Sequence, residues 1–331
     1  MKSILVTGVA GYIGSHTVKA LLDADYDVHV LDNLASGVRD AVDVRAHFKE
    51  LDVYDELALK DYLQSHKIDA VLHYAGEIVV SESIENPSKY FAANVAGMNR
   101  VLKVLSEVGI DKIIFSSTAS VYGNNCMDKP ANEDTLLNPV NPYAETKLMG
   151  ERMIYWMANR YSWKYVIFRY FNVAGAAMDT SNGLRVKNPT HIIPNINKTA
   201  LGQNDALKIY GDDYETRDGS CIRDYIHVLD LAQAHVKGFD YLFTDSSTSQ
   251  IFNLGTEQGY TVKEIYNTAE QILQQKIPHE IVARRSGDPA SVLANASKAK
   301  EFLNWQATYS LKDIIFSDYR WRVKAGNSIV E

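Results

Sequence analysis

Residues 4–14 read ILVTGVAGYIG, and this stretch decides the fold. Its first three residues are apolar and typical of a buried strand, and its glycines recur at Gly8, Gly11 and Gly14. Helical periodicity follows through Ile13, Thr17 and Leu21. Strand, glycine turn and helix together predict a dinucleotide-binding entry. The glycines let the backbone approach a pyrophosphate, and the helix N-terminus stabilises its charge.

A second strand, predicted over residues 27–31, ends in Asp32. An acidic residue about 20 positions beyond the first glycines is typical of sites that bind the ribose of NAD. An NADP site requires a cation for the 2′-phosphate, but Asn33 and Leu34 follow here. We therefore predict NAD, although Arg39 is a nearby cation and keeps NADP open as an alternative.

Strand and helix patterns then alternate along the chain. Further strands are expected over residues 47–53, 70–73 and 112–115, and helices over residues 57–63 and 87–108. Repeated β-α units produce a parallel sheet with helices on both faces. We predict an α/β fold with a Rossmann-type doubly wound sheet, whose ligands lie at the carboxyl ends of the strands.

The helix expected over residues 87–108 has one apolar stripe. Its predicted inner residues are Phe91, Val95, Met98, Leu102 and Leu105. Asn94 lies within the same segment. An asparagine on a core helix acts either as a structural hydrogen-bonding group or as a cofactor contact, and the sequence leaves both readings open.

Tyr143 and Lys147 lie four residues apart, directly after Pro142, which favours a helix start. The spacing puts both side chains on one helix face. A neighbouring cation and the positive helix end favour the phenolate, so the pair is suited to moving a proton on and off a hydroxyl. Alone, such a short motif also arises by chance. Thr118, at the end of the preceding strand, either contacts a substrate oxygen or belongs to a hydroxyl-rich turn.

Composition excludes several classes of protein. The 331 residues are 46% hydrophobic and 23% charged, which is ordinary for a soluble globular protein. The net charge of -7 argues against general nucleic-acid binding. Two cysteines, Cys126 and Cys221, imply no disulfide framework. We expect a cytoplasmic protein with no signal peptide, no membrane segment and no metal in its active site.

The pattern changes beyond Asn172. Residues 174–188 are rich in Gly, Asn, Asp and Ser and show little periodicity. We predict a dinucleotide-binding domain over residues 1–173 and a smaller C-terminal α/β substrate domain over residues 174–331. A segment near residues 223–242 is expected to return to the first domain, because residues 230–241 show helical periodicity.

Six segments carry a resemblance to a known family. They are GYIGSH (11–16), LDNL (31–34), FSST (115–118), RYFN (169–172), RDYIH (223–227) and RRSGD (284–288). Together with Tyr143 and Lys147, they make the chain similar to the extended short-chain dehydrogenase/reductase family. Within it, the nucleotide-sugar 4-epimerases are the most similar. The segments follow the family's order over nearly the whole chain.

The resemblance implies two sets of site residues. The cofactor set is Gly8, Gly11, Tyr12, Ile13, Gly14, Asp32, Asn33, Leu34, Ala35, Ser36, Gly37, Asp52, Val53, Tyr74, Ala75, Gly76, Ile78, Asn94, Tyr143, Lys147, Tyr170 and Phe171. The substrate set is Thr118, Asn172, Tyr210, Arg223, Arg285, Asp288 and Val292. The implied catalytic residues are Tyr143 as the base, Lys147 on the nicotinamide ribose, and Thr118 on the reacting sugar hydroxyl.

The same resemblance implies an activity. The enzyme would interconvert UDP-glucose and UDP-galactose by transient oxidation at C4, with hydride returned to the opposite face of a 4-keto sugar. Arg223 and Arg285 would grip the diphosphate, since guanidinium groups suit phosphate oxygens, although surface salt bridging would also explain them. A homodimer is expected through the helix over residues 87–108 and the helix that carries Tyr143.

Two departures and two alternatives accompany this reading. Ile78 stands where some relatives have lysine, and Val292 stands where some have tyrosine, which leaves room for an N-acetyl group. A nucleotide-sugar 4,6-dehydratase needs Asp-Glu after the threonine, but Ala119 and Ser120 follow Thr118 here. A non-enzymatic NAD-sensing protein would not need the tyrosine and lysine pair.

Overall fold

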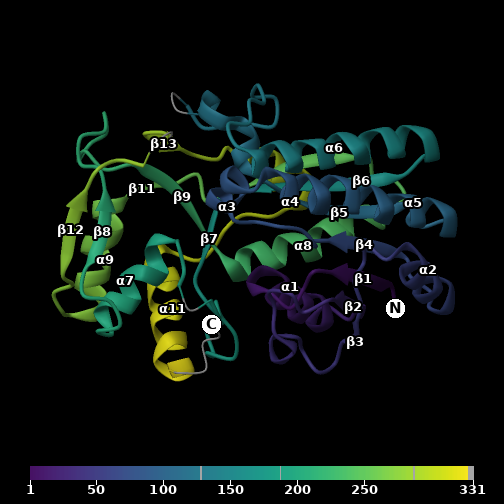
Figure 1. The fold of residues 1–331 in the computed structure, drawn as a ribbon, viewed down its shortest axis with the longest axis horizontal. Helices are drawn as coiled ribbons and strands as arrows, with labels where there is room; N and C mark the ends of the chain where they lie inside the picture. The colour runs from purple at the N-terminus through teal and green to yellow at the C-terminus, as the bar shows by residue number, and fades with distance from the viewer. Residues whose placement is uncertain (127–128, 187, 286–287, 327–331) are drawn as a thin grey trace.

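The computed structural model describes residues 1–126, 129–186, 188–285 and 288–326 (Figure 1). Its largest sheet has seven parallel strands in the order β10-β6-β5-β4-β1-β2-β3. They are β1 (Ser3–Thr7), β2 (Asp27–Asp32), β3 (His47–Glu50), β4 (Ala70–His73), β5 (Lys112–Thr118), β6 (Lys164–Tyr170) and β10 (Gln250–Leu254). The chain starts near the middle and winds outward in both directions, which confirms the predicted doubly wound fold.

Helices cover both faces of this sheet. Figure 1 shows α5 and α6 on one side and α1 and α8 on the other. Their bounds are α1 (Tyr12–Asp23), α2 (Glu56–Ser65), α5 (Met98–Val108), α6 (Pro142–Tyr161) and α8 (Val228–Leu242). Leu21 and Phe239, from α1 and α8, belong to one buried core, and Leu59, Leu102 and Ile154 belong to the other. Each core fills the space between the sheet and one helical layer.

Close backbone packing requires glycine at two positions of the turn after β1. Gly8 has a φ of +71°, a region that favours glycine, and a Cβ built there would lie 2.5 Å from the Cα of Ala75. A Cβ on Gly14 would lie 2.8 Å from the Cα of Val9. The first and third glycines therefore let β1, α1 and the end of β4 approach one another closely.

The helix predicted over residues 87–108 is continuous but not uniform. It consists of α4 (Pro87–Phe91), a π-helical segment over Ala92–Gly97, and α5. The predicted inner stripe is correct at Met98, Leu102 and Leu105 but wrong at Phe91, whose residue surface is 37% exposed. Tyr90 is buried in its place. The wider π turn changes the angular spacing of side chains, so a stripe of constant α-helical period does not extend through it.

A second group of elements follows β6. Strands β7 (Asn172–Ala174), β9 (Ile222–His227), β11 (Gly259–Thr261) and β13 (Ser291–Val292) form a small sheet, and β8 (Leu207–Tyr210) pairs with β12 (His279–Val282). Helices α7 (Ile192–Ala200), α9 (Val262–Leu273) and α11 (Leu311–Ala325) contribute residues to a core of their own. Strand β7 spans the predicted boundary at residue 173, so the division into domains stays a prediction.

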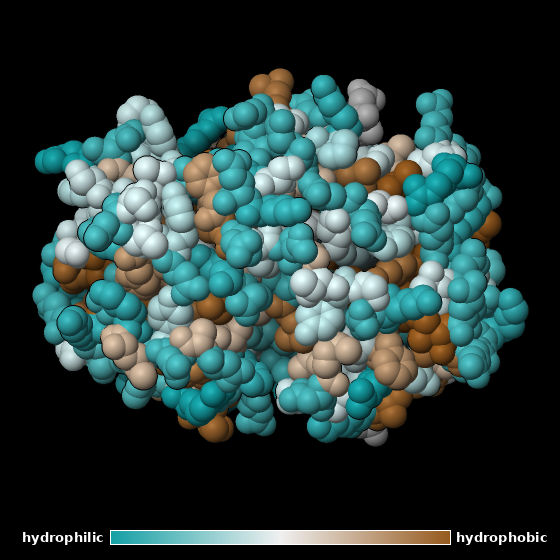
Figure 2. Space-filling model, turned by 180° about the vertical axis from the view of Figure 1, so that it is seen from behind, coloured by the Kyte–Doolittle hydropathy of each residue, from teal (hydrophilic) through white to brown (hydrophobic). Residues whose placement is uncertain are grey.

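Helix α8 packs against the large sheet. Leu231, Ala234 and Phe239 of α8 lie in the same core as α1, as expected for the returning segment. The other α-helices in the described residues are α3 (Val80–Glu85) and α10 (Ser297–Leu303), and 3-10 helices span Arg39–Ala41 and Ala119–Cys126. In the described part of the chain, no helix is long and apolar enough to cross a membrane. On the face shown in Figure 2, hydrophobic residues form small separate groups among hydrophilic ones.

Candidate active site

Helix α6 presents Tyr143 and Lys147 at its first turns, as predicted. Pro142 is its first residue, and the side chain of Asn141 caps the helix by accepting a hydrogen bond of 2.9 Å from the backbone N–H of Ala144. Because Tyr143, Lys147 and Glu151 recur at four-residue spacing, they lie on one helix face. The cap fixes where that face begins and therefore where the phenol lies.

The carboxyl end of β5 meets this face. The Lys147 ammonium donates a hydrogen bond of 2.9 Å to the carbonyl oxygen of Ser116. Hydrogen bonding from the nearby Thr118 hydroxyl lowers the pKa of the Tyr143 phenol. Thr118 also accepts a hydrogen bond of 3.2 Å from the backbone N–H of Ser120. The structure thus brings together the three residues for which we predicted catalytic roles, although those roles stay predictions.

The electrostatics of the pair differ from the expectation. Burial raises the pKa of Tyr143 to about 12, and the hydrogen bond from Thr118 offsets this only in part. Burial also lowers the pKa of Lys147 to about 8. A low-dielectric site disfavours both charged forms, and this outweighs the mutual attraction that we had expected to favour the phenolate. A further positive charge beside the phenol would lower its pKa.

A network of buried side-chain hydrogen bonds, with one ion pair, joins the elements that carry the site. Glu151 accepts hydrogen bonds from Arg169 Nε at 2.9 Å and Nη2 at 2.5 Å, and from the Ser117 hydroxyl. Arg169 also donates to the Tyr122 hydroxyl at 3.0 Å, which in turn donates to Asn253 Oδ1 at 2.7 Å. Sequence reasoning missed this network. Glu151 is one helical turn beyond Lys147, and that spacing was the available signal.

Two further residues at strand ends close the site. Tyr170, at the end of β6, forms a hydrogen bond with the Ser116 hydroxyl. Burial and the nearby Tyr143 raise the pKa of Tyr170. Phe171 is buried in a cluster with Ala119 and Leu148. Both aromatic residues therefore lie beside the catalytic candidates, as expected for the walls of a nicotinamide pocket.

The glycine loop has the features of an anion site. Gly11 caps α1 without a side-chain hydrogen bond, so the first-turn amides are not occupied by a capping side chain. A Cβ built on Gly11 would meet no atom within 4 Å, in contrast to Gly8 and Gly14. Open space in front of a helix N-terminus fits a pyrophosphate. These features agree with a dinucleotide cofactor.

Asp32 is buried at the end of β2 and is held in place by the backbone. Its carboxylate accepts hydrogen bonds of 2.8 Å from the N–H of Ala10 and 2.7 Å from the N–H of Leu34. A Cβ on Gly37 would lie 2.4 Å from the Cβ of Ala10, so the following loop folds back over the glycine turn. The predicted ribose residues and the predicted pyrophosphate residues are therefore adjacent.

The remaining cofactor candidates occupy varied environments. Tyr12 donates a hydrogen bond to the carbonyl of Gly175, and Tyr74 contacts Thr17 and His235 at 2.9 Å each. The Ile78 surface is 65% exposed. The others lie on loops or at strand and helix ends: Ile13, Asn33, Ala35, Ser36, Asp52, Val53, Ala75 and Gly76.

Asn94 makes structural hydrogen bonds. Its side-chain oxygen accepts from the backbone N–H of Glu77 at 2.8 Å, and its amide donates to the carbonyl of Glu77 and to the Thr146 hydroxyl at 3.0 Å each. Both amide hydrogens are used. The bonds fasten the loop after β4 and the π-helical segment to α6, which favours the structural reading of this residue over the cofactor reading.

Asn172, Arg223 and Val292 of the predicted substrate residues lie on the small sheet, whereas Tyr210 lies on β8. Arg223 forms an ion pair with Asp288, and Arg285 lies over the ring of Tyr210, 3.9 Å from its centroid. Val292 pairs in register with Arg223. Asn172 of β7 pairs with Tyr225 of β9, the strand that also carries Arg223. Val292 packs on the hydrophobic cluster that contains Phe171. Ser286 and Gly287 of the RRSGD segment lie outside the described residues.

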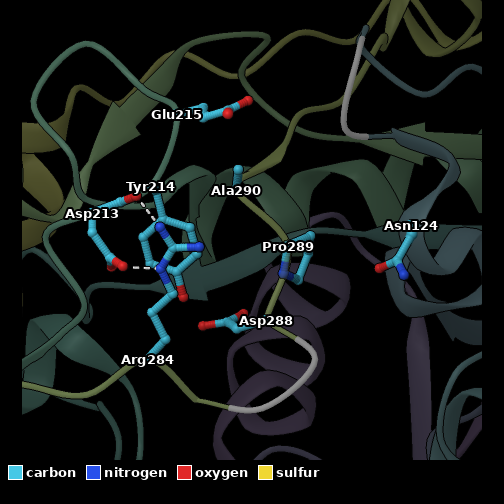
Figure 3. A pocket seen from close by; sticks show the side chains of 8 residues that line it. All are labelled: Asn124, Asp213, Tyr214, Glu215, Arg284, Asp288, Pro289 and Ala290. Carbon is cyan, nitrogen blue, oxygen red and sulfur yellow. Dashed lines mark hydrogen bonds and ion pairs between the residues drawn. The ribbon is translucent and has the colours of Figure 1, made fainter.

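A surface pocket of about 400 Å³ adjoins this group (Figure 3). Its lining residues are Asn124, Asp213, Tyr214, Glu215, Arg284, Asp288, Pro289 and Ala290. Figure 3 shows the Arg284 side chain reaching Asp213 beside the ring of Tyr214, and Asp288 below Pro289. Among the described residues that line it, Asp288 is the only predicted substrate residue, and none is a predicted catalytic residue. The pocket is therefore distinct from the group formed by Thr118, Tyr143 and Lys147.

Comparisons with known proteins agree with this geometry. Residues 4–255 match the model of the NAD dependent epimerase/dehydratase family. The chain belongs to this family. UDP-glucose 4-epimerase from Lacticaseibacillus casei is 44% identical to it over 320 residues, which cover 96% of each chain. Family membership confirms the resemblance inferred from the six sequence segments.

Solved structures extend the likeness to the fold. A crystal structure of a UDP-glucose 4-epimerase has a TM-score of 0.95 and 43% identity and covers 100% of both chains. The UDP-glucose 4-epimerase from Bifidobacterium longum, determined with NAD+ and UDP, has a TM-score of 0.92 and 36% identity. It covers 98% of this chain and 99% of its own. These family members share the arrangement of strands described above.

The buried network yields a prediction about stability. Glu151→Gln keeps the shape of the side chain but leaves Arg169 buried without its charge partner, which we expect to cost about 3–5 kcal/mol of unfolding free energy. Urea unfolding measures the difference. Glu107→Gln removes an exposed carboxylate paired with Lys60 and is the control, expected to leave the unfolding midpoint unchanged. Equal midpoints for the two variants would show that Arg169 does not depend on Glu151.

Proposed function

We infer that this protein is a NAD-dependent epimerase that interconverts UDP-galactose and UDP-glucose. One observation carries the inference: Tyr143 and Lys147 of α6 meet the end of β5, where Thr118 lies, in a chain that aligns over 96% of its length with a UDP-glucose 4-epimerase. Inverting an unactivated sugar carbon requires breaking a C–H bond that has no acidic proton. Bound NAD would supply the acceptor and donor for that hydride.

The residues present fit the cofactor. The open space at Gly11 and the first turn of α1 would hold the pyrophosphate, and Asp32 would accept hydrogen bonds from the adenosine ribose. Lys147 would bind the nicotinamide ribose. Its low pKa of about 8 leaves it mostly protonated at neutral pH, so it would still place a positive charge next to Tyr143.

In the proposed reaction, Thr118 orients the sugar by hydrogen-bonding its O4 hydroxyl. Tyr143 removes the O4 proton as C4 is oxidised, which gives a 4-keto sugar. The sugar then turns over within the pocket while the nucleotide stays bound. Tyr143 returns the proton after reduction from the opposite face. Hydrogen bonding to Thr118 favours the phenolate form on which the first step depends.

We expect the substrate residues to hold the nucleotide tightly and the sugar loosely. Arg223 and Arg285 would hold the diphosphate, Tyr210 would lie by the uracil, and Asp288 would bind the ribose of the nucleotide. The sugar must rotate, so its wall has to be permissive. Val292, which packs beside Phe171, is our candidate for that wall.

Neither alternative has comparable support. In the 4,6-dehydratase reading, an acid and a base must follow Thr118, but Ala119 is buried and apolar and Ser120 is hydrogen-bonded to Thr118 itself. In the NAD-sensing reading, the contacts among Thr118, Tyr143 and Lys147 would serve no purpose. A protein of this kind would only bind the nucleotide.

We further propose a cytoplasmic homodimer. Helix α6 exposes Trp156 and Tyr155, whose residue surfaces are 68% and 48% exposed. Large aromatic residues gathered on one exposed helix face favour association with a second copy. Size-exclusion chromatography with light scattering distinguishes a dimer from a monomer.

Replacing the base tests the mechanism. Tyr143→Phe removes the group that moves the O4 proton, and we expect kcat to fall by at least about 100-fold while UDP binding persists. Tyr155→Phe, on the exposed side of the same helix, is the matched control and is expected to keep its activity. Near-normal turnover by Tyr143→Phe would remove this residue from the mechanism.

The cofactor can be identified directly. Asp32 favours a free ribose hydroxyl over a 2′-phosphate, because a carboxylate accepts hydrogen bonds and repels an anion. Acid treatment of the purified protein should therefore release NAD, which chromatography separates from NADP. Release of mainly NADP would overturn the assignment of Asp32.

Pocket size should determine the range of sugars. We expect epimerisation of UDP-N-acetylglucosamine as well as UDP-glucose, because Val292 leaves room for the acetamido group. Val292→Tyr should suppress the N-acetyl reaction selectively. A steric mismatch of about 1–3 kcal/mol changes the ratio of kcat/KM values by about 10- to 200-fold. An unchanged ratio would mean that Val292 does not line the sugar pocket.

A further inference from the structure

Three potential metal ligands lie together near the edge of the large sheet, at the end of β2 opposite to the predicted cofactor site. Asp27 and His29 are two residues apart on β2 and therefore point to the same face. His47, the first residue of β3, pairs in register with His29. Parallel pairing places these side chains next to one another. The group lies at the amino end of β2, whereas Asp32 lies at its carboxyl end.

The atoms that would bind a metal face one another. Asp27 Oδ1 lies 3.1 Å from His47 Nε2, and Asp27 Oδ2 lies 3.4 Å from His29 Nε2. Ligand atoms from all three residues lie within 4.8 Å of one another. Bonds of about 2.0–2.2 Å to a tetrahedral zinc ion separate its ligands by about 3.3–3.6 Å. The two measured distances fall close to that range, so small side-chain movements would complete the site.

A second layer of contacts holds the ligands in place. His29 Nδ1 lies 2.8 Å from the Tyr62 hydroxyl, a contact that leaves Nε2 to face the carboxylate. Asp27 is hydrogen-bonded by the Ser3 hydroxyl of β1. The site thus connects β1, β2, β3 and α2.

We propose that Asp27, His29 and His47 bind one divalent transition-metal ion of the zinc class. One carboxylate and two imidazoles match the preference of Zn²⁺ for nitrogen and oxygen ligands, and water would complete the shell because His47 is 62% exposed. The ion would fasten the edge strand β3 to β2. Since the site is remote from Tyr143, it would act on stability and not on catalysis.

Zinc titration of the metal-free, untagged protein tests the site. Calorimetry should show one Zn²⁺ per chain, and the melting temperature should rise with Zn²⁺. His47→Ala removes an exposed ligand, so the fold should persist while both effects disappear. His279→Ala removes an exposed histidine elsewhere and should keep both effects. Tyr62→Phe should weaken binding by about 10- to 100-fold through the loss of its contact with His29.

Two results would overturn the proposal. One is equal zinc affinity in the parent protein and His47→Ala, which would place the binding elsewhere. The other is the absence of any heat of binding or thermal shift when the metal-free parent protein is titrated with Zn²⁺. Epimerase activity should be the same with zinc and with a chelator, so failure of this proposal is distinguishable from failure of the proposed function.

Discussion

The buried ion pair between Glu151 and Arg169 is the contact on which the active site depends. It joins α6 to β6, and the Ser117 hydroxyl adds β5. The residues of this network are next to candidate site residues in the sequence. Ser117 precedes Thr118, and Arg169 precedes Tyr170. Glu151 lies one turn beyond Lys147. A shift of the pair would therefore move the phenol, the ammonium and the threonine together, and proton transfer tolerates little misplacement.

The small sheet extends this arrangement towards the nucleotide. Strand β7 follows β6 after a single residue and pairs with β9, which places Asn172 beside Tyr225. Strand β13 also pairs with β9, which places Val292 beside Arg223. Arg223 is buried and forms an ion pair with Asp288. It therefore provides a fixed positive group in a chain whose net charge is -7. This arrangement would anchor the nucleotide on one sheet and place the sugar at the carboxyl end of the other, so that one site could be tight for UDP and permissive for the hexose.

Local patterns predicted much of this from the sequence. The glycine turn, Asp32 and the start of α6 depend on short-range chemistry, and they lie where we expected. The failures have long-range causes. The π-helical segment before α5, which ends at Gly97 against the ring of Tyr54, interrupts the helical period, and Phe91 is exposed. The ion pair between Glu151 and Arg169 joins α6 to β6, and no local sequence pattern indicates that these two side chains meet. The high pKa of Tyr143 comes from burial, which charge spacing along a helix does not reveal.

The central claim is that C4 gives up its hydrogen as hydride to a bound cofactor and receives the same hydrogen back on the other face. The most direct measurement uses UDP-galactose deuterated at C4, incubated in ordinary water with the purified protein and no added reductant. Nuclear magnetic resonance should show UDP-glucose that retains deuterium at C4. Loss of deuterium to water would mean that the hydrogen leaves as a proton, and accumulation of a 4-keto-6-deoxy sugar would mean that the enzyme eliminates water instead.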